Sequence, residues 1–209
     1  VDDYIVLYAS WLKIIQSFYQ NLLIVTTYDG RLDTWVPIIH LAEMNEDFFN
    51  QKQASGDEIW YYICSGPGDP YFNRFTYQPL LVNRAQFWWC YKFNRTGLLH
   101  WAWNQWNFGL ADGDGYIVYK DEANNSVRPS IRYENLRDGI EDYEFFKILE
   151  RKDKNKARSL IDELVDNAHS FCNDIATITR VRNELVRSAS SNPPPQTPQP
   201  VLGQITVDG

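Results

Sequence analysis

The stretch T-G-L-L-H-W-A-W-N-Q-W-N, from Thr96 to Asn107, has the pattern of a buried strand that ends among aromatic side chains. Gly97 breaks the preceding apolar segment, and residues 98–103 form a short apolar run suited to a strand covered on both faces. Three tryptophans lie toward its end: Trp101, Trp103 and Trp106. We therefore expect a strand whose carboxyl end opens onto a surface rich in indole rings.

The positions of these residues predict different surroundings. Trp101 lies inside the apolar run, where an indole fits a packed core as well as a binding surface. Trp106 lies beyond the run, between two polar residues, where an indole is better placed to stack on a ligand. His100, also inside the run, is expected to be a core residue whose hydrogen bonds are satisfied.

The composition narrows the class of protein. Aromatic residues make up 15% of the 209 residues, and all eight tryptophans lie before Asn107. The formal net charge of -7 argues against a nucleic-acid partner, because phosphate binding relies on clustered Lys and Arg. The sequence contains no apolar run of membrane-spanning length and no signal peptide. The length suits one ordinary core, or one domain with a tail.

The sequence predicts no metal or cofactor site. Cys64, Cys90 and Cys172 lack the spacing of a zinc site. The first two are expected as buried thiols, and a disulfide between them is the less favoured alternative. Asp112 and Asp114 lie in a D-G-D-G motif without the spacing or terminal Glu of an EF-hand, so we expect a turn. A Ser/His/Asp order, a nucleophile elbow and a phosphate-binding loop are absent from the sequence.

Apolar periodicity predicts alternating helices and strands. Short strands are expected to start at Leu22, Thr34, Glu58 and Leu98, and residues 112–120 to form a small exposed hairpin. The expected helices cover residues 3–20, 42–53, 79–93, 130–150, 154–173 and 175–188. This alternation is typical of a parallel sheet with helices outside it. Ser130 is expected to cap its helix, and Gly139 to lie where another backbone passes close by.

The composition also divides the chain into four segments. Residues 1–150 form the α/β part, and residues 151–189 form a polar helical extension expected on the surface. Residues 190–200, S-S-N-P-P-P-Q-T-P-Q-P, form a Pro-rich linker. Residues 201–209 alternate in polarity like the first strand of a further domain.

Aromatic residues gather at the expected carboxyl ends of the strands, where binding sites of parallel α/β proteins lie. Amide and hydroxyl groups lie between them, which suits a sugar: its apolar ring faces stack on aromatic rings while its hydroxyls take hydrogen bonds. The predicted sugar-binding residues are Trp35, Tyr62, Trp101, Trp103, Asn104 and Trp106, with Tyr28 as the weakest candidate.

The expected strand ends lack the acids that cut a glycosidic bond. Hydrolysis uses two carboxyl groups, or one acid and a group that steadies the substrate's acetamide. The Asp-Glu pair at 57–58 precedes its strand, the pair at 121–122 follows the hairpin, and the pair at 162–163 lies on a polar helix face. Asp29 and Asp33 are better explained as turn or cap residues. The residues alone therefore predict the ligand-binding half of an enzyme without its catalytic pair.

Five motifs in order carry a resemblance to a known family. They are L-D-T-W-V-P at 32–37, G-D-E-I-W-Y-Y-I-C at 56–64, T-G-L-L-H-W-A-W-N at 96–104, G-D-G-Y-I-V-Y at 113–119 and S-I-R-Y-E-N-L-R-D-G-I-E-D-Y-E at 130–144. Over about residues 22–149, the chain resembles the carboxyl-terminal part of the glycoside hydrolase family 123 catalytic domain, which is widespread in bacteria.

This resemblance implies the carboxyl-terminal half of a (β/α)8 TIM barrel, formed by the last four parallel strands with outer helices and followed by a helical tail. It implies action on N-acetylhexosaminides, as in β-N-acetylgalactosaminidases, with retention through the substrate's own acetamide. The family's adjacent Asp-Glu pair is expected before Val1, because Asp2-Asp3 does not match it. The isolated chain is therefore expected to be inactive. A secreted or cell-surface location is implied in the same way.

The expected partners are the glycan substrate and the amino-terminal half of the same barrel. The exposed strand edges of a half barrel also predict self-association. The alternative to this enzyme is a non-catalytic carbohydrate-binding or scaffold module, in which the same aromatic residues bind glycan or only pack.

Overall fold

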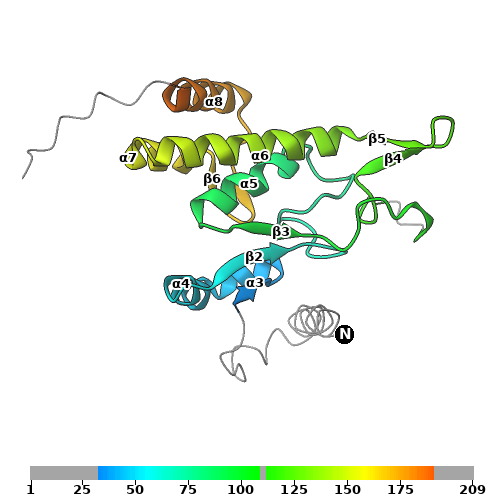
Figure 1. The fold of residues 1–209 in the computed structure, drawn as a ribbon, viewed down its shortest axis with the longest axis horizontal. Coiled ribbons are helices and arrows are strands. Elements are labelled where there is room, and N and C mark those ends of the chain that lie inside the picture. The colour runs from blue at the N-terminus through cyan, green and yellow to red at the C-terminus, as the bar shows by residue number, and fades with distance from the viewer. Residues whose placement is uncertain (1–32, 109–111, 191–209) are drawn as a thin grey trace, which may run out of the picture.

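The computed structural model describes residues 33–108 and 112–190 (Figure 1). Five expectations lie outside the described residues: the helix at 3–20, the strand at Leu22, the site residue Tyr28, the Pro-rich linker after residue 190 and the final segment.

A parallel sheet of three strands lies at the centre. Its strands are β1 (Thr34–Trp35), β2 (Glu58–Tyr62) and β3 (Gly97–Leu99), in the order β1-β2-β3. Thr34 pairs with Glu58, and Trp60 pairs with Gly97. The expected parallel sheet of an α/β protein is confirmed. The half barrel with four strands is not confirmed, since the described residues form a sheet of three strands.

In the part of the chain that the structure describes, helices pack around these strands: three of them connect the strands, and three follow later in the chain (Figure 1). They are α3 (Ile39–Met44), α4 (Glu46–Ala54), α5 (Val82–Lys92), α6 (Ile131–Glu150), α7 (Lys154–Asp162) and α8 (Ile175–Ser190). The helix expected at 42–53 is two helices separated at Asn45, whose side chain donates to the Leu41 carbonyl at 3.0 Å. α6 begins as expected, because the Ser130 hydroxyl accepts from the Tyr133 backbone N–H at 3.2 Å.

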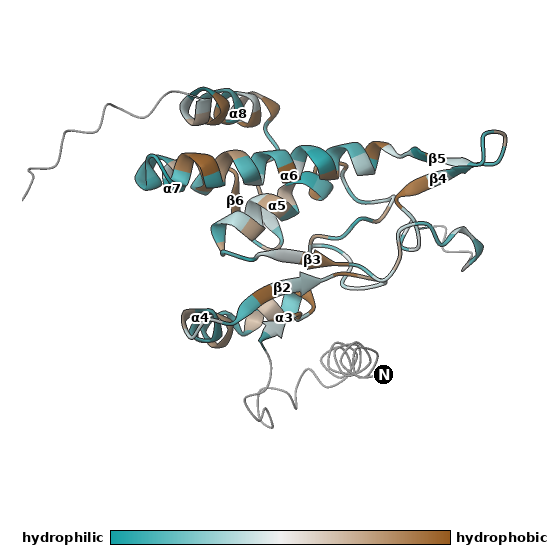
Figure 2. Cartoon of the chain, viewed as in Figure 1, coloured by the Kyte–Doolittle hydropathy of each residue, from teal (hydrophilic) through white to brown (hydrophobic). Residues whose placement is uncertain are grey.

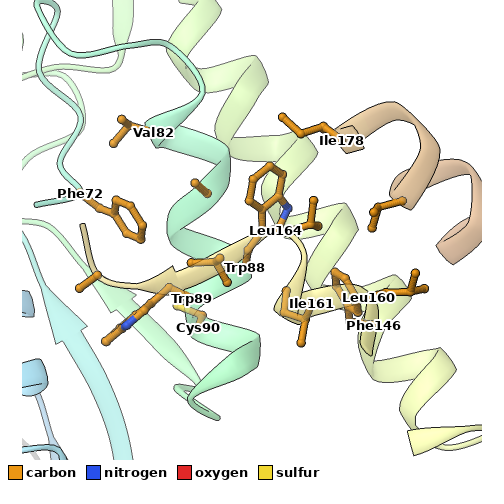
Figure 3. Packing of buried hydrophobic residues seen from close by; sticks show 14 of the residues in the cluster. Phe72, Val82, Trp88, Trp89, Cys90, Phe146, Leu160, Ile161, Leu164 and Ile178 are labelled. Carbon is orange, nitrogen blue, oxygen red and sulfur yellow. The ribbon is translucent and has the colours of Figure 1, made fainter. Parts of the chain in front are cut away.

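One hydrophobic core joins the sheet to helices α5 to α8 (Figure 3). Tyr61 of β2 packs edge-on against Trp89 of α5, with ring centroids 5.3 Å apart. Leu160 of α7 and Val181 of α8 are buried in the same cluster. Figure 2 shows hydrophobic and hydrophilic residues alternating along α6 and α8, as expected for helices with one face in a core. The polar segment after residue 150 is therefore a structural part of the α/β unit.

α6 lies against α5 at Gly139, as the sequence predicts. A Cβ added to Gly139 would lie 2.6 Å from Phe87 Cδ2 and 2.8 Å from the Arg84 carbonyl oxygen. Any side chain larger than hydrogen would therefore force the two helices apart.

A buried carboxylate joins three helices. Asp142 of α6 accepts hydrogen bonds from Arg84 Nε at 2.7 Å and Trp88 Nε1 at 2.8 Å, both on α5. It also accepts one from Arg182 Nη1 of α8 at 2.5 Å. Hydrogen bonds from two guanidinium groups and an indole therefore offset the cost of removing this carboxylate from water.

Two expected elements are placed differently in the structure. The hairpin is β4 (Val118–Asp121) with β5 (Ser126–Pro129), so the D-G-D-G turn precedes it rather than forming its tip. The helix expected at 154–173 ends at Asp162, and β6 (Val165–Asn167) and β7 (Ser170–Phe171) follow it. Val165, a β-branched residue suited to a strand, is buried in the core.

No helix among the described residues combines the length and apolar character needed to cross a membrane.

Candidate functional site

Side chains from several stretches of the chain meet at the carboxyl ends of β2 and β3. Tyr62 ends β2, and His100 and Trp101 follow β3. Arg74 reaches the same place from the loop after β2, and Asp114 reaches it from the D-G-D-G turn. We name Tyr62, Arg74, His100, Trp101 and Asp114 the rim cluster.

Asp114 is the centre of the rim cluster. It is 1% exposed, and each carboxylate oxygen faces a ring nitrogen. His100 Nε2 lies 3.0 Å from Oδ1, and Trp101 Nε1 donates to Oδ2 at 2.8 Å. A carboxylate only accepts hydrogen bonds, so two ring N–H groups suit its ionised form.

The partners of His100 determine its tautomer. Its Nδ1 accepts from the Ala102 backbone N–H at 3.1 Å, which requires Nδ1 to carry no proton. Burial lowers the pKa of His100, against the opposing effect of its hydrogen bond to Asp114. The ring is therefore neutral at neutral pH, and its proton lies on Nε2, which donates to Asp114. As expected from the sequence, both ring nitrogens of His100 are satisfied.

The pKa of Asp114 lies below its ordinary value. Burial would raise it, but hydrogen bonds from His100 and Trp101 and the nearby charge of Arg74 together outweigh burial. The carboxylate is therefore ionised at neutral pH and has no proton to give to a leaving group. Its contacts suit a residue that holds other side chains in place.

Two buried arginines hold the backbone beneath the rim cluster. Arg74 Nη2 donates to the carbonyl oxygens of Ala102 and Asp114, the latter at 3.0 Å. Arg132 of α6 donates to the backbone carbonyls of Arg74, Gly113 and Tyr116. Burial lowers the pKa of Arg74 to about 10, so its guanidinium stays charged at neutral pH.

The segment after β3 is paired with the segment after the D-G-D-G turn. Ile117 N donates to the Trp103 carbonyl at 3.0 Å, and Asn104 forms an antiparallel bridge with Tyr116. Trp106 lies in a short 3-10 helix (Trp106–Phe108), and its Nε1 donates to the Val118 carbonyl at 2.8 Å. The apolar run expected as strand at 98–103 is strand only to Leu99, because this pairing draws the chain away from the sheet.

The structure brings most of the predicted site residues together. Trp101 is 41% exposed, Trp103 is 45% exposed, and Asn104 is also exposed. Trp106 is partly buried beside them. Exposed indoles are uncommon on a folded protein and are consistent with a ligand-binding surface.

Tyr62 is half-buried at the end of β2. Burial raises the pKa of its hydroxyl well above the ordinary value, Cys64 beside it adds to the rise, and the charge of Arg74 opposes it. The hydroxyl is therefore protonated at neutral pH, and as such it can donate or accept a hydrogen bond.

Trp35 lies elsewhere. It is 3% exposed in a separate small cluster with Phe49 and Ile59, and its Nε1 donates to Asp57 Oδ2 at 2.9 Å. Asp57 precedes β2, so this pair lies at the amino-terminal end of the sheet, opposite the rim cluster. The structure does not bring Trp35 together with the other predicted site residues.

The three Asp-Glu pairs of the chain have other partners. Asp57 accepts from Trp35, and Glu58 accepts from Trp60 Nε1 at 3.2 Å. The pair at 121–122 binds Arg128 and Lys120 in the hairpin, and the pair at 162–163 binds Lys92, Arg158 and Arg180. Within the described ranges, no group of three or more His, Cys, Asp or Glu is arranged to hold a metal ion.

Sequence reasoning missed Asp114, Arg74 and Arg132 as residues of this site. Asp114 was expected only as a turn residue, which it also is: its backbone N–H donates to Asp112 Oδ1 at 3.1 Å. The signal in the sequence was the glycine next to Asp114. Gly113 has a φ of +84°, in the left-handed region that favours glycine. A Cβ there would lie 2.6 Å from Arg132 Nη1.

The described residues form a parallel α/β sheet with exposed indoles at its carboxyl edge, where the ligand sites of such folds lie. The chain belongs to glycoside hydrolase family 123, because the family model named "Glycoside hydrolase 123, catalytic domain" matches residues 5–149. The family resemblance seen in the sequence motifs is thereby confirmed. No curated protein matches the chain.

A solved structure is similar in fold. It is a family 123 glycoside hydrolase from Clostridium perfringens, reported in a study of glycolipid glycan hydrolysis. It is 19% identical, with a TM-score of 0.58 over 76% of this chain and 32% of that one. The chain therefore corresponds to about a third of that enzyme's length.

Proposed function

We propose that the chain forms the sugar-stacking part of a glycoside hydrolase site that acts on N-acetylhexosaminides. The observation that carries the proposal is the position of Trp101 and Trp103, which expose their indoles at the carboxyl edge of a parallel sheet. Membership of family 123 makes a glycosidic bond the target. Tyr62 and Asn104 are the polar groups that we assign to the sugar's hydroxyls or acetamide.

We further propose that the catalytic Asp-Glu pair comes from a part of the protein outside this chain. Two observations support this. The three Asp-Glu pairs of the chain are bound away from the rim cluster, and Asp114 has no free oxygen. Retention through the substrate's acetamide then needs only an acid and a group that orients that acetamide.

Binding of N-acetylgalactosamine to this chain, measured by titration calorimetry, tests the stacking role. Replacing one indole, in Trp101→Ala or Trp103→Ala, should weaken binding by about threefold to tenfold, as expected for the loss of one aromatic stacking contact. Met44→Ala is the control, because it removes an exposed apolar side chain from α3 without changing the rim. Unchanged affinity in both tryptophan variants would reject the assignment.

Hydrolysis of 4-nitrophenyl N-acetyl-β-galactosaminide tests the origin of the catalytic pair. We expect no turnover by this chain alone and turnover with retained anomeric configuration by the complete protein. Turnover by the chain alone would show that its own acids suffice.

One observation favours a non-catalytic carbohydrate-binding module as the second candidate. Asp114, Arg74 and Arg132 find hydrogen-bond partners within this chain, so a binding surface forms without another domain. Tight glycan binding by the chain, combined with no turnover by the complete protein, would favour the module.

We propose that the amino-terminal half of the barrel covers the open edges of the sheet. β1 and β3 are the outer strands of the described sheet, and uncovered strand edges pair readily with other chains. Without that half, the chain should therefore self-associate on a sizing column. A monodisperse monomer would contradict the proposal.

A further inference from the structure

We propose that Asp114 is the positioning residue of the sugar site: its carboxylate fixes the orientation of the Trp101 indole before a sugar arrives. This inference rests on the proposed function and names a residue that touches no sugar itself. It predicts that Asp114 acts on sugar affinity through Trp101 and not through its own charge.

The two exposed indoles of the site differ in how they are held. Trp101 and Trp103 have nearly the same exposure, 41% and 45%. Trp101 Nε1 donates to Asp114 Oδ2 at 2.8 Å, and its ring stacks beside His100 with centroids 6.2 Å apart. Among residues 33–108 and 112–190, Trp103 Nε1 has no hydrogen-bond partner. The N–H of one indole is thus hydrogen-bonded within the described part of the chain, and that of the other is not.

The Asp114 carboxylate, which holds the Trp101 indole, is itself held in place by its neighbours. His100 Nε2 occupies the second oxygen of Asp114, so the carboxylate cannot rotate without losing one of its two partners. The backbone of Asp114 is held by Arg74 Nη2 and by the Asp112 side chain. Arg132 holds the neighbouring Gly113 carbonyl at 3.1 Å. Every group that positions the carboxylate is therefore in place without a ligand.

A fixed indole lowers the entropy lost on binding. A side chain that is ordered only when the ligand arrives costs affinity, and one that is ordered beforehand does not. Trp101 is 41% exposed, so part of its ring remains open for stacking while Asp114 holds its N–H. Loss of the anchor should therefore weaken binding while leaving the stacking surface present.

A double-mutant cycle tests whether Asp114 acts through Trp101. Asp114→Asn keeps the size of the side chain but replaces one acceptor oxygen with an amide, and should weaken N-acetylgalactosamine binding by about threefold to tenfold. In a Trp101→Phe background, which has no indole N–H, the same change should have almost no effect. Losses that multiply in the double variant would overturn the proposal, because Asp114 would then act independently of Trp101.

Asp121→Asn is the matched control. Asp121 is a buried aspartate of the hairpin that accepts from Arg128 Nε at 2.8 Å and Asn124 Nδ2 at 2.9 Å. Its replacement also removes a buried carboxylate charge, so a general effect of lost charge on stability should show in both variants. Only Asp114→Asn should change the NMR shift of the Trp101 indole N–H, and the Trp103 indole should stay unchanged in both.

Hydrogen exchange in the unaltered chain gives a test that needs neither a variant nor a sugar. The Trp101 indole proton should exchange at least about tenfold more slowly than that of Trp103, because one is hydrogen-bonded and the other is not. Equal exchange rates of the two indole protons would overturn the proposal that Asp114 holds the Trp101 indole. Slow exchange at Trp101 without any sugar binding would instead reject the proposed function and leave the anchoring intact.

Discussion

Two aspartate–tryptophan pairs in this protein use the same hydrogen bond in opposite surroundings. In the core, Trp88 Nε1 donates to Asp142 at 2.8 Å, and Trp88 is 0% exposed. In the rim cluster, Trp101 Nε1 donates to Asp114 at the same distance, yet Trp101 is 41% exposed. In both pairs the carboxylate is buried. The difference lies in the indole, which is fully buried in one pair and partly exposed to solvent in the other.

This comparison separates a core tryptophan from one that we propose binds sugar. A buried ring contributes its whole surface to folding, whereas a partly exposed ring contributes less and leaves part of its surface open to a ligand. We therefore expect changes in the core pair to alter stability and changes in the rim pair to alter sugar affinity.

The largest contrast is expected between Trp88→Ala and Trp101→Ala. Trp88→Ala removes a fully buried indole and should destabilise the fold by about 3–5 kcal/mol. Trp101→Ala should cost less, about 1–3 kcal/mol, because it removes a partly exposed ring but also takes one donor from the buried Asp114 carboxylate. Urea unfolding of both variants measures the difference. Similar losses would show that Trp101 is a core residue and would remove the distinction between the pairs.

Asp142→Ala should be nearly as damaging. It leaves the Arg84 guanidinium and the Trp88 indole without their acceptor and Arg182 with Glu141 alone, which should cost about 3–5 kcal/mol. Glu144→Ala, at an exposed position of the same helix, is the control and should change stability by less than about 0.5 kcal/mol. Sugar affinity per folded molecule should stay unchanged in both. Loss of affinity in Asp142→Ala would show that core and rim are coupled.

Gly139→Ala should have a smaller effect. Alanine favours helix by about 1 kcal/mol over glycine, but its Cβ would meet Phe87 and the Arg84 backbone. Separating α5 from α6 should cost about 1–3 kcal/mol, which outweighs that gain. Thermal unfolding should therefore show a lower Tm. An unchanged or higher Tm would show that the helices can separate at no cost.

The smallest effect concerns pH. The folded pKa of Asp114 is lowered, so its stabilising contribution is complete above the pKa of the unfolded chain and is lost as pH falls toward the lower folded value. The stability difference between the unaltered chain and Asp114→Asn should therefore be constant near neutral pH and shrink only below about pH 4. Urea unfolding across this range checks it. A difference that shrinks between pH 7 and pH 5 would contradict a lowered pKa.

The local features of the fold were predictable from the sequence. The helix cap at Ser130 depends on Tyr133, only three positions away. The strand that begins at Glu58 depends on its own apolar run. The close approach at Gly139 was also predicted. Glycine lowers the stability of an otherwise regular helix, so its presence there indicates a neighbour that leaves no room for a side chain.

The centre of the candidate site was not predictable in the same way. His100 and Asp114 are 14 positions apart, Arg74 and Asp114 are 40, and Arg132 and Arg74 are 58. Their contacts depend on how three loops meet at one edge of the sheet, and no local pattern encodes that meeting. The aromatic residues of the candidate site could be proposed from the sequence because three tryptophans follow one another closely at the end of an apolar run, whereas the D-G-D-G motif has the composition of an ordinary hairpin turn.

The contact between Arg182 and Asp142 has a practical consequence for anyone producing this protein. Arg182 lies beyond the last residue matched by the family model, yet it supplies one of the donors to the carboxylate between α5 and α6. A gene shortened to the matched region would encode a chain that lacks α7 and α8 and leaves apolar surface of α5 and α6 open to water. Such a product should aggregate on expression, and the boundary for cloning therefore belongs after α8.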